Sequence, residues 1–301
     1  MDIIQKIKDL KMRKNAVILA HCYQNIEIDE VADYVGDSLG LSQLAAKTNA
    51  DIIVFAGVFF MAQTAKILSP DKKVLLPNLA SGCNMADMID EKQIIEFKEK
   101  NPNVPVVCYV NSTAEVKAHA DICCTSSNAV EVVRSLNVPK VLFVPDAYLG
   151  SWVAKNLPNV EVVCYPGFCP THLRITKEHI EELKKQYPRA KVLIHPECHQ
   201  EVVALADFVG STTQIMNYCK NSDAGAFIIG TEMGVVERLE RDYPDKTFIL
   251  ACPKAFCHNM KLHTLGDILN SLEDEVNEIT LSEDLRLKAL VPIEKMIAIS
   301  Q

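Results

Sequence analysis

One pattern that occurs three times constrains the fold of this chain more than any other feature. The tripeptide Ala32-Asp33-Tyr34 returns as Ala120-Asp121-Ile122 and as Ala206-Asp207-Phe208, so the numbering advances by 88 and then by 86 residues. Self-similarity at a long, nearly constant period indicates a repeated structural unit. A period of this length is enough for a small domain, and the sequence therefore predicts three homologous units.

Residues with chemically useful side chains recur at nearly the same offsets. One cysteine near the end of each copy falls in register, and we call this set the repeat cysteines: Cys83, Cys169 and Cys257. None of the other cysteines recurs in all three copies. Two further sets recur, one at the end of the first strand of each copy and one before a helix: His21, Tyr109 and His195, and then Ser38, Ser126 and Thr212.

Short runs of valine, isoleucine and leucine alternate with helical segments in every copy, which is typical of buried parallel strands in α/β layers. We expect an α/β fold of three homologous three-layer α/β/α domains, arranged with pseudo-threefold symmetry around a central active site. The expected domains are residues 1–86, 87–172 and 173–261, with the C-terminal tail 262–301 packed on the first. The expected strands are residues 16–20, 52–55, 73–76, 106–110, 141–144, 160–164, 192–194, 226–229 and 248–251.

The charge of the chain favours small molecules as partners. A net charge of −8 at pH 7 argues against a broad nucleic-acid surface and against binding to an anionic membrane. The first residues lack the basic region and apolar block of a secretion signal, and the longest apolar run, residues 54–62, is too short to span a bilayer. We therefore expect a cytoplasmic protein with no nucleic-acid or membrane partner, in which the 11 cysteines form no disulfide framework.

The repeat cysteines predict a shared metal centre. Zinc prefers four tetrahedral ligands, and its structural sites usually contain close Cys-x-x-Cys pairs, which this trio does not supply. Three thiolates are better suited to a 4Fe-4S cluster in which one iron keeps an open coordination position. An open iron is a Lewis acid that eases the loss of water from a substrate. The alternative is a set of buried thiols that recur only because the copies share an ancestor.

The recurring residues stand where α/β proteins collect ligands, at the carboxyl ends of the strands. Ser38, Ser126 and Thr212 occupy positions where a hydroxyl can cap a helix, beside free N–H groups and the positive end of the helix dipole. Plain capping is the alternative for each of them, because serine and threonine cap helices in many proteins. Three such helix ends around one cavity would attract carboxylates or phosphate.

Six specific motifs, spread over most of the chain, carry a family resemblance: residues 19–24, 32–38, 109–112, 125–129, 195–198 and 210–212. In these motifs the chain resembles the quinolinate synthase family, the A protein of bacterial NAD biosynthesis, and its length and three-unit plan agree. This resemblance implies an enzyme, a transferase that condenses and dehydrates. The family joins iminoaspartate (iminosuccinate) to dihydroxyacetone phosphate and releases quinolinate, phosphate and water.

The resemblance also implies roles for individual residues. The repeat cysteines would hold the 4Fe-4S cluster, whose open iron binds substrate or intermediate atoms. Glu197 would act as general acid and base, Tyr23 would assist proton transfer, and His195 would join them in catalysis. L-Aspartate oxidase is a possible transient partner that would hand over the unstable imine. The residues implied to hold the substrates are His21, Ser38, Tyr109, Asn111, Ser126, His172, His195, Glu197, Ser211 and Thr212.

Two other classes of function stay open at this point. The same three-unit cup would serve a non-catalytic iron–sulfur or metabolite sensor, although the sequence contains no helix-turn-helix or basic face as an output module. A zinc-dependent hydrolase is the third reading. The loop before Cys257 also departs from some relatives, which carry more cysteines there, so Cys252 is a candidate redox partner or substitute ligand.

Overall fold

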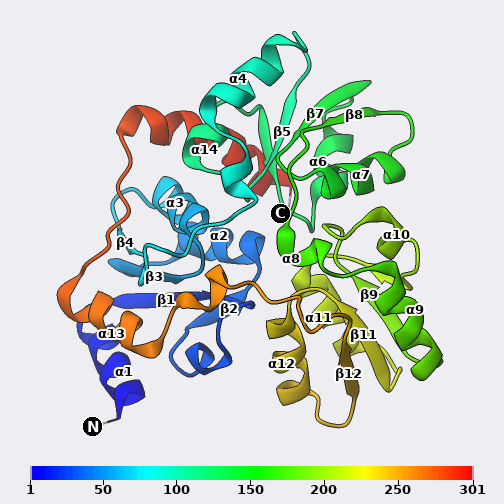
Figure 1. Cartoon of the computed structure of the whole chain (residues 1–301). Coiled ribbons are helices and arrows are strands. Elements are labelled where there is room, and N and C mark those ends of the chain that lie inside the picture. Colours follow the sequence, from blue (N-terminus) through cyan, green and yellow to red (C-terminus); the bar gives the residue numbers. More distant parts are fainter. Residues whose placement is uncertain (1, 300–301) are drawn as a thin grey trace.

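The structure is a computed structural model that describes residues 2–299, and its strands form three separate lobes (Figure 1). The first lobe contains α1 (Ile3–Arg13), β1 (Ala16–His21), η1 (Ile26–Glu30), β2 (Tyr34–Gly36), α2 (Ser38–Lys47), β3 (Ile52–Ala56), α3 (Phe59–Leu68), β4 (Lys73–Leu75) and η2 (Ala86–Met88). The second contains α4 (Glu91–Glu99), β5 (Val106–Tyr109), α5 (Ala114–Lys117), β6 (Ile122–Cys124), α6 (Ala129–Ser135), β7 (Lys140–Val144), α7 (Ala147–Asn156), β8 (Glu161–Cys164) and α8 (Pro170–Leu173).

The third lobe and the tail complete the described chain. The third lobe contains α9 (Lys177–Gln186), β9 (Lys191–Ile194), α10 (Gln200–Val203), β10 (Phe208–Val209), α11 (Thr212–Asn221), β11 (Ala226–Gly230), α12 (Met233–Asp242), β12 (Thr247–Leu250) and η3 (Asn259–Leu262). The tail consists of α13 (Leu265–Asp274) and α14 (Glu283–Ile299).

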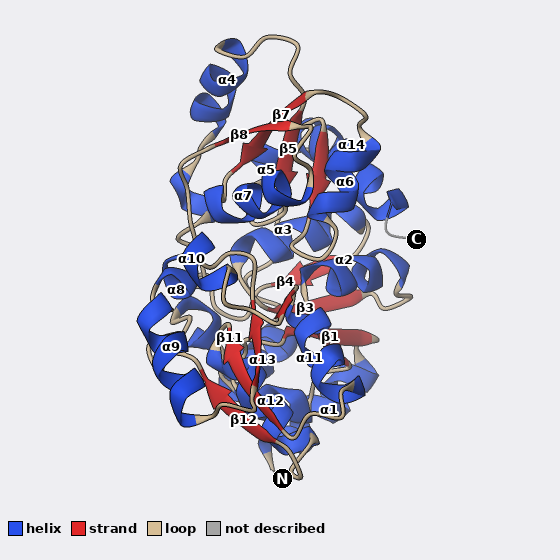
Figure 2. Ribbon diagram, turned by 90° about the vertical axis from the view of Figure 1, so that its right-hand side faces the viewer, coloured by secondary structure: helices blue, strands red, loops and turns tan. Residues whose placement is uncertain are grey.

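Each lobe is built on one four-stranded sheet, and the three sheets share a single topology. Their strand orders are β2-β1-β3-β4, β6-β5-β7-β8 and β10-β9-β11-β12, and every pair of neighbouring strands is parallel. Helices lie between successive strands and flank the sheets (Figure 2). The predicted α/β class and the threefold repetition of the unit are therefore confirmed.

The aspartate of the repeated tripeptide has an architectural role that explains its recurrence. In each unit its carboxylate accepts a hydrogen bond from a backbone N–H of the first strand, while its own N–H donates to the carbonyl of that same strand residue. This pair of bonds fixes how the first strand and the short second strand lie together. The carboxylate distances are 2.8 Å for Asp33 with Ile18, 2.7 Å for Asp121 with Val106 and 2.8 Å for Asp207 with Val192.

The structure contains elements that the sequence pattern did not predict. The second strand of each sheet is an edge strand of two or three residues, which is too short to show an alternating pattern. Helices α4 and α9, which open the second and third units, were also missed. Each is mostly polar and fully buries a single side chain, Ile94 in α4 and Ile180 in α9, so neither has a strong apolar stripe.

The first and third units share one hydrophobic core. Leu19 and Phe55 of the first sheet belong to the same buried cluster as Leu193 and Phe227 of the third. The core of the second unit includes Val107 and Phe143, and Ile67 and Met85 of the first unit belong to it. The first unit therefore shares buried apolar side chains with both of the other units.

The tail divides between two units, which differs from the expectation that all of it packs on the first. Helix α13 packs against α1 and buries Ile268 and Leu272 in a cluster with residues of β1 and β3. Helix α14 instead packs on β6 and α5, and its apolar side chains enter the core of the second unit (Figure 1). The apolar side chains along one helix do not specify which unit will cover them, and for this reason the sequence did not predict the partner of α14.

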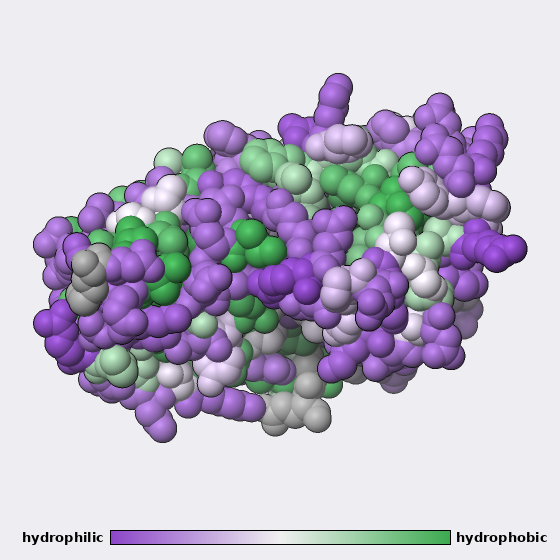
Figure 3. Space-filling view, turned by 90° about the horizontal axis from the view of Figure 1, so that it is seen from below, coloured by the Kyte–Doolittle hydropathy of each residue, from purple (hydrophilic) through white to green (hydrophobic). Residues whose placement is uncertain are grey.

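The surface is mainly hydrophilic on the face shown in Figure 3, where apolar residues form separate patches between charged ones. Isolated exposed apolar side chains, such as Tyr34 and Leu79, are normal on a globular protein. Among residues 2–299, no helix combines the length and apolar character needed to cross a membrane.

Candidate active site

All three units contribute to one cavity of about 130 Å³. It lies at the carboxyl ends of the sheets, because His21 ends β1, Tyr109 ends β5 and His195 directly follows β9. Of the residues predicted from the sequence, thirteen line it: His21, Tyr23, Ser38, Cys83, Tyr109, Asn111, Ser126, Cys169, His172, His195, Glu197, Thr212 and Cys257. Ser211 does not line the cavity.

A hydrogen bond repeated in every unit positions the repeat cysteines. The first residue of the helix after the third strand donates its backbone N–H to the carbonyl two residues before the cysteine. The same bond therefore fixes the start of each cysteine loop against the same helix. The three bonds are Phe59 N to Ser81 O at 2.8 Å, Ala147 N to Gly167 O at 2.9 Å and Met233 N to Ala255 O at 3.0 Å.

Hydrogen bonds also connect the three cysteine loops to one another. Asn259, just after Cys257, donates from Nδ2 to the carbonyl of Gly82 at 2.9 Å and to Asn84 Oδ1 at 3.2 Å. Arg174, at the end of α8, donates from Nη1 to the carbonyls of Lys254 and Phe256, both at 3.1 Å. These contacts join loops from three units into a single structure around the cavity.

The surroundings of the repeat cysteines suit a metal centre. Burial is the largest influence on all three thiols and raises their pKa, to about 12 for Cys83. Backbone N–H groups two or three residues further on act in the opposite direction, from Ala86 and Met85 toward Cys83 and from Met260 and Asn259 toward Cys257. A positively charged centre is therefore needed to hold these sulfurs as thiolates, and N–H groups aimed at sulfur are a common setting for iron–sulfur clusters.

The sulfurs of the repeat cysteines do not all lie as close together as the ligands of a single ion. Within residues 2–299, Cys169, His172 and Glu197 are the one group of possible ligands whose atoms all lie within 4.8 Å of one another, and the repeat cysteines form no such group. Sulfurs bound to a single zinc at about 2.3 Å would lie within roughly 4 Å of each other. The donor set is therefore compatible with a 4Fe-4S cluster. The Cys169, His172 and Glu197 group is instead accounted for by hydrogen bonds through His172.

His21 and His195 are held in the same way and offer the same kind of donor. Nδ1 of His21 accepts the backbone N–H of Tyr23 at 3.1 Å, and Nδ1 of His195 accepts that of Glu197 at 3.3 Å. Burial lowers the pKa of both imidazoles to about 3, so they are neutral at pH 7. With Nδ1 occupied as an acceptor, the ring proton is on Nε2, and each histidine presents one N–H donor.

Glu197 is a buried carboxylate with two partners. The hydroxyl of Tyr109 donates to Oε1 at 2.5 Å, and Nδ1 of His172 lies 2.8 Å from Oε2. Burial acts against ionisation of Glu197, but the interaction with His172 and these hydrogen bonds outweigh it and lower the pKa. Burial, and then the charge of Glu197, raises the pKa of Tyr109 well above 10. The site thus contains an ionised carboxylate beside a protonated phenol.

A line of hydrogen bonds connects Tyr23 with Glu197. The Tyr23 hydroxyl lies 2.7 Å from Oγ1 of Thr231, which lies 3.0 Å from Nε2 of His172, and the opposite ring nitrogen of His172 contacts Glu197. Oγ1 of Thr212 donates to the Tyr23 oxygen at 3.2 Å. Since the carboxylate only accepts, Nδ1 of His172 donates to Glu197. The two hydroxyls and the imidazole therefore form a continuous line between Tyr23 and the carboxylate.

The predicted hydroxyl residues do not cap their helices. The cap of α2 is Asp37, whose side chain accepts the N–H of Gly40, and the cap of α11 is Ser211, which accepts that of Gln214. Ser38 and Thr212 are instead the first helical residues, and both line the cavity. Ser211 has a supporting place, since it caps α11 and donates to Asp37 at 3.3 Å. Because Asp37 caps α2, the Ser38 hydroxyl can contact a ligand, whereas the Thr212 hydroxyl already donates to Tyr23.

Asn111 provides an unused acceptor in the cavity. Its Oδ1 is buried and has no hydrogen-bond partner among residues 2–299. A buried oxygen of this kind is costly to leave unsatisfied, so it marks a place for a ligand or water donor. This agrees with the placement of Asn111 among the predicted binding residues.

Several residues of the site were not predicted from the sequence. Thr231 links Tyr23 to His172, and Asn259 and Arg174 link the cysteine loops, while Asp37 and Thr125 line the cavity. Only Asp37 and Thr125 lay within motifs that had been singled out, each next to a predicted serine. Thr231 directly follows the end of β11, and Asn259 lies two residues after Cys257. Neither residue type recurs at the corresponding positions of the other copies.

Comparisons with known proteins agree with this arrangement. The family model described as "Quinolinate synthetase A protein" matches residues 5–298. The quinolinate synthase of Alkaliphilus metalliredigens is 55% identical over 298 residues, covering 99% of this chain and 98% of the relative. That of Pelobacter propionicus is 54% identical over 297 residues, with coverage of 99% and 98%. The chain therefore belongs to the quinolinate synthase family.

Proposed function

We propose that the chain is a quinolinate synthase that condenses iminoaspartate (iminosuccinate) with dihydroxyacetone phosphate, giving quinolinate, phosphate and water for NAD biosynthesis. The observation that carries this proposal is that three cysteines from three repeated units line one cavity together with the Glu197 network. We also propose that residues 1–86, 87–172 and 173–261 are three domains related by pseudo-threefold symmetry. We expect the enzyme to be cytoplasmic, to act on small-molecule substrates and to contact L-aspartate oxidase transiently.

The repeat cysteines would hold a 4Fe-4S cluster as its three protein ligands. When bound, such a cluster supplies a Lewis acid at its open iron, which assists the departure of a hydroxyl group. The loops around it are already joined by the Asn259 and Arg174 hydrogen bonds, so the protein offers a preformed place for the group.

Substrate carboxylates and phosphate would be held by neutral donors at the strand ends. His21 and His195 each present an Nε2–H, and Ser38 presents a hydroxyl at the N-terminus of α2. Thr212 at the N-terminus of α11 would contact substrate by turning its hydroxyl from Tyr23. These helix ends favour anions because of their free N–H groups and dipole. Asn111 and Ser126 from the second unit complete the set of polar residues proposed to bind substrate.

Proton transfer would centre on Glu197. As an ionised buried carboxylate it can take a proton from a substrate, and its contact with Tyr109 provides a proton that can be returned. Tyr23 is a second proton source, connected to Glu197 through Thr231 and His172. Two protonated phenols on either side of one carboxylate suit a reaction in which several atoms are deprotonated and reprotonated in turn.

The test is to purify the chain without oxygen, measure iron and sulfide, and assay quinolinate and phosphate formation from dihydroxyacetone phosphate and freshly made iminoaspartate. We expect a cluster and turnover, and Glu197→Gln is expected to lower kcat by about 100-fold to 10,000-fold with the cluster retained. The matched control is Glu201→Gln, a largely exposed glutamate four residues away. A cluster without turnover would support a sensor instead, and zinc without iron would support a hydrolase.

A further inference from the structure

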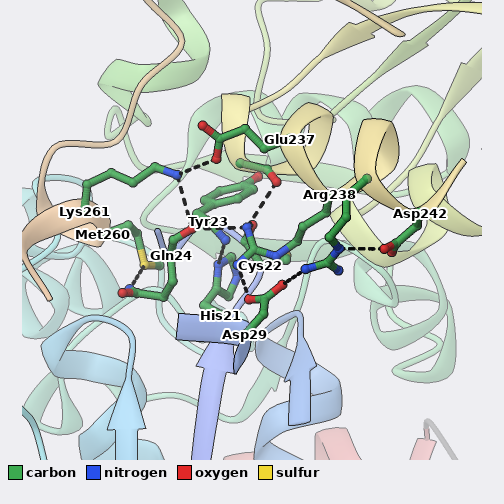
Figure 4. A network of polar contacts seen from close by, with 12 residues as sticks. His21, Cys22, Tyr23, Gln24, Asp29, Glu237, Arg238, Asp242, Met260 and Lys261 are labelled. Carbon is green, nitrogen blue, oxygen red and sulfur yellow. Dashed lines mark hydrogen bonds and ion pairs between the residues drawn. The ribbon is translucent and has the colours of Figure 1, made fainter. Parts of the chain in front are cut away.

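The turn after β1 carries two side chains of the proposed active site and presents its carbonyl groups to the third unit. His21 and Tyr23 line the cavity, while the carbonyls of Cys22 and Gln24 lie toward α12 (Figure 4). The position of the two side chains therefore depends on what holds these carbonyls.

Arg238 of α12 holds both of them. Its Nη1 donates to the carbonyl of Cys22 at 2.8 Å and to that of Gln24 at 3.1 Å, and also to Gly234 of its own helix at 3.1 Å. Its Nη2 pairs with Oδ1 of Asp29 at 2.5 Å. The side chain is only 1% exposed, so these partners replace water around a buried charge.

Lys261 attaches the same turn to the loop of Cys257. Its Nζ donates to the carbonyl of Gln24 at 3.2 Å and lies 3.4 Å from Oε2 of Glu237. The neighbouring Met260 accepts a hydrogen bond at Sδ from Nε2 of Gln24 at 3.5 Å. One carbonyl thus receives two cationic donors from two different segments, and we call Arg238 and Lys261 the cationic clamp (Figure 4).

Gly234 permits this close approach. A Cβ at this position would lie 2.9 Å from the Cys22 carbonyl oxygen and 3.1 Å from Lys261 Nζ. Any larger residue would push α12 away from the turn. The glycine at the start of α12 therefore belongs to the same arrangement as the cationic clamp.

A buried arginine between two units has a simpler explanation, which is an ion pair that joins them. The contacts favour a second role, because Asp29 is already paired with Arg241 at 2.7 Å, and Nη1 of Arg238 is directed at the turn carbonyls. Arg241 has a 47% exposed side chain and touches neither carbonyl group of the turn.

We propose that Arg238 is a positioning residue, which with Lys261 holds His21 and Tyr23 in their working positions through the carbonyls of Cys22 and Gln24. This inference rests on the proposed function for its effect on turnover. Its physical basis is that a displacement of about 1 Å in a catalytic group can lower a rate by about 100-fold. Lysine cannot replace arginine here, because one ammonium does not reproduce a planar donor that spans several acceptors.

The experiment compares variants of the cluster-containing enzyme. Arg238→Met is expected to lower kcat about 100-fold and Arg238→Lys about 10-fold, with iron and sulfide content and the KM for dihydroxyacetone phosphate within about 2-fold of wild type. The matched control is Arg241→Met, which removes an ion pair with Asp29 but leaves the carbonyl bonds of Arg238, and it is expected to keep kcat within about 2-fold. Hydrogen exchange at the amides of residues 22–25 should be faster in the Arg238 variants only.

Each outcome decides the inference. Folded Arg238 variants with wild-type kcat and exchange would overturn it, and so would an equal loss of kcat in Arg241→Met, because the effect would then belong to the ion pairs with Asp29. If neither Arg238 variant folds, Lys261→Met decides by the same two measurements. If wild type makes no quinolinate, the proposed function fails, while faster exchange in the Arg238 variants still supports positioning of the turn.

Discussion

Acidification should destabilise the folded protein through His21 and His195. Burial lowers the pKa of both rings to about 3, whereas in the unfolded chain a histidine titrates near 6.5. Between pH 3 and pH 6.5 the unfolded state therefore binds more protons than the folded state. Linkage then requires that the free energy of unfolding falls as the pH is lowered through this window.

The size of the effect follows from the two pKa values. Between pH 7 and pH 5 each histidine should lower the free energy of unfolding by about 2 kcal/mol, so both together contribute about 4 kcal/mol. Asp146 acts in the opposite direction, because burial and then the charge of Glu197 raise its pKa. The change in the free energy of unfolding of the wild type with pH therefore does not report on the two histidines alone. The effect of the histidines must be measured by comparing variants with the wild type.

The assay is urea unfolding at pH 7, 6 and 5 without oxygen, for wild type, His21→Gln, His195→Gln and the double variant. Each single substitution should reduce the loss of stability between pH 7 and pH 5 by about 2 kcal/mol, whatever it does to stability at pH 7. A double variant with the same pH dependence as wild type would refute the reasoning, since it would mean that the folded protein protonates these rings as readily as the unfolded chain.

Three further predictions concern the cluster and the proton path. Changing any repeat cysteine to alanine should abolish iron and sulfide binding, whereas Cys123→Ala, which lies in the core of the second unit, should retain the cluster by metal analysis. Thr231→Val removes the hydroxyl between Tyr23 and His172 without changing the side-chain shape, and should lower kcat about 100-fold, in contrast to Thr213→Val outside the cavity. Glu232 accepts the backbone N–H groups of Gly234 at 2.7 Å and Cys257 at 3.1 Å. Glu232→Gln should therefore lower the free energy of unfolding by about 1–3 kcal/mol and speed cluster loss in air, measured by absorbance.

The repeated unit could be predicted from the sequence because the patterns that reveal it lie within short stretches of the chain. The apolar runs identified nine of the twelve strands in residues 2–299, and the recurring tripeptide revealed the period, since its aspartate makes the same bonds to the first strand in each unit. The repeat cysteines were readable for the same reason, as each follows the same strand and helix. The second strand of each sheet was missed because its two or three residues carry no periodic signal.

The sequence by itself determined the residue types of the site, the three-unit plan and the positions at strand ends where those residues lie. Only the tertiary structure decided which side chains meet: that α14 enters the second core, that Thr231 lies between Tyr23 and His172, and that Arg238 reaches the turn after β1. The physical reason is that hydrogen bonding and burial patterns act over a few residues, whereas these contacts join segments up to about two hundred residues apart through the packing of whole units.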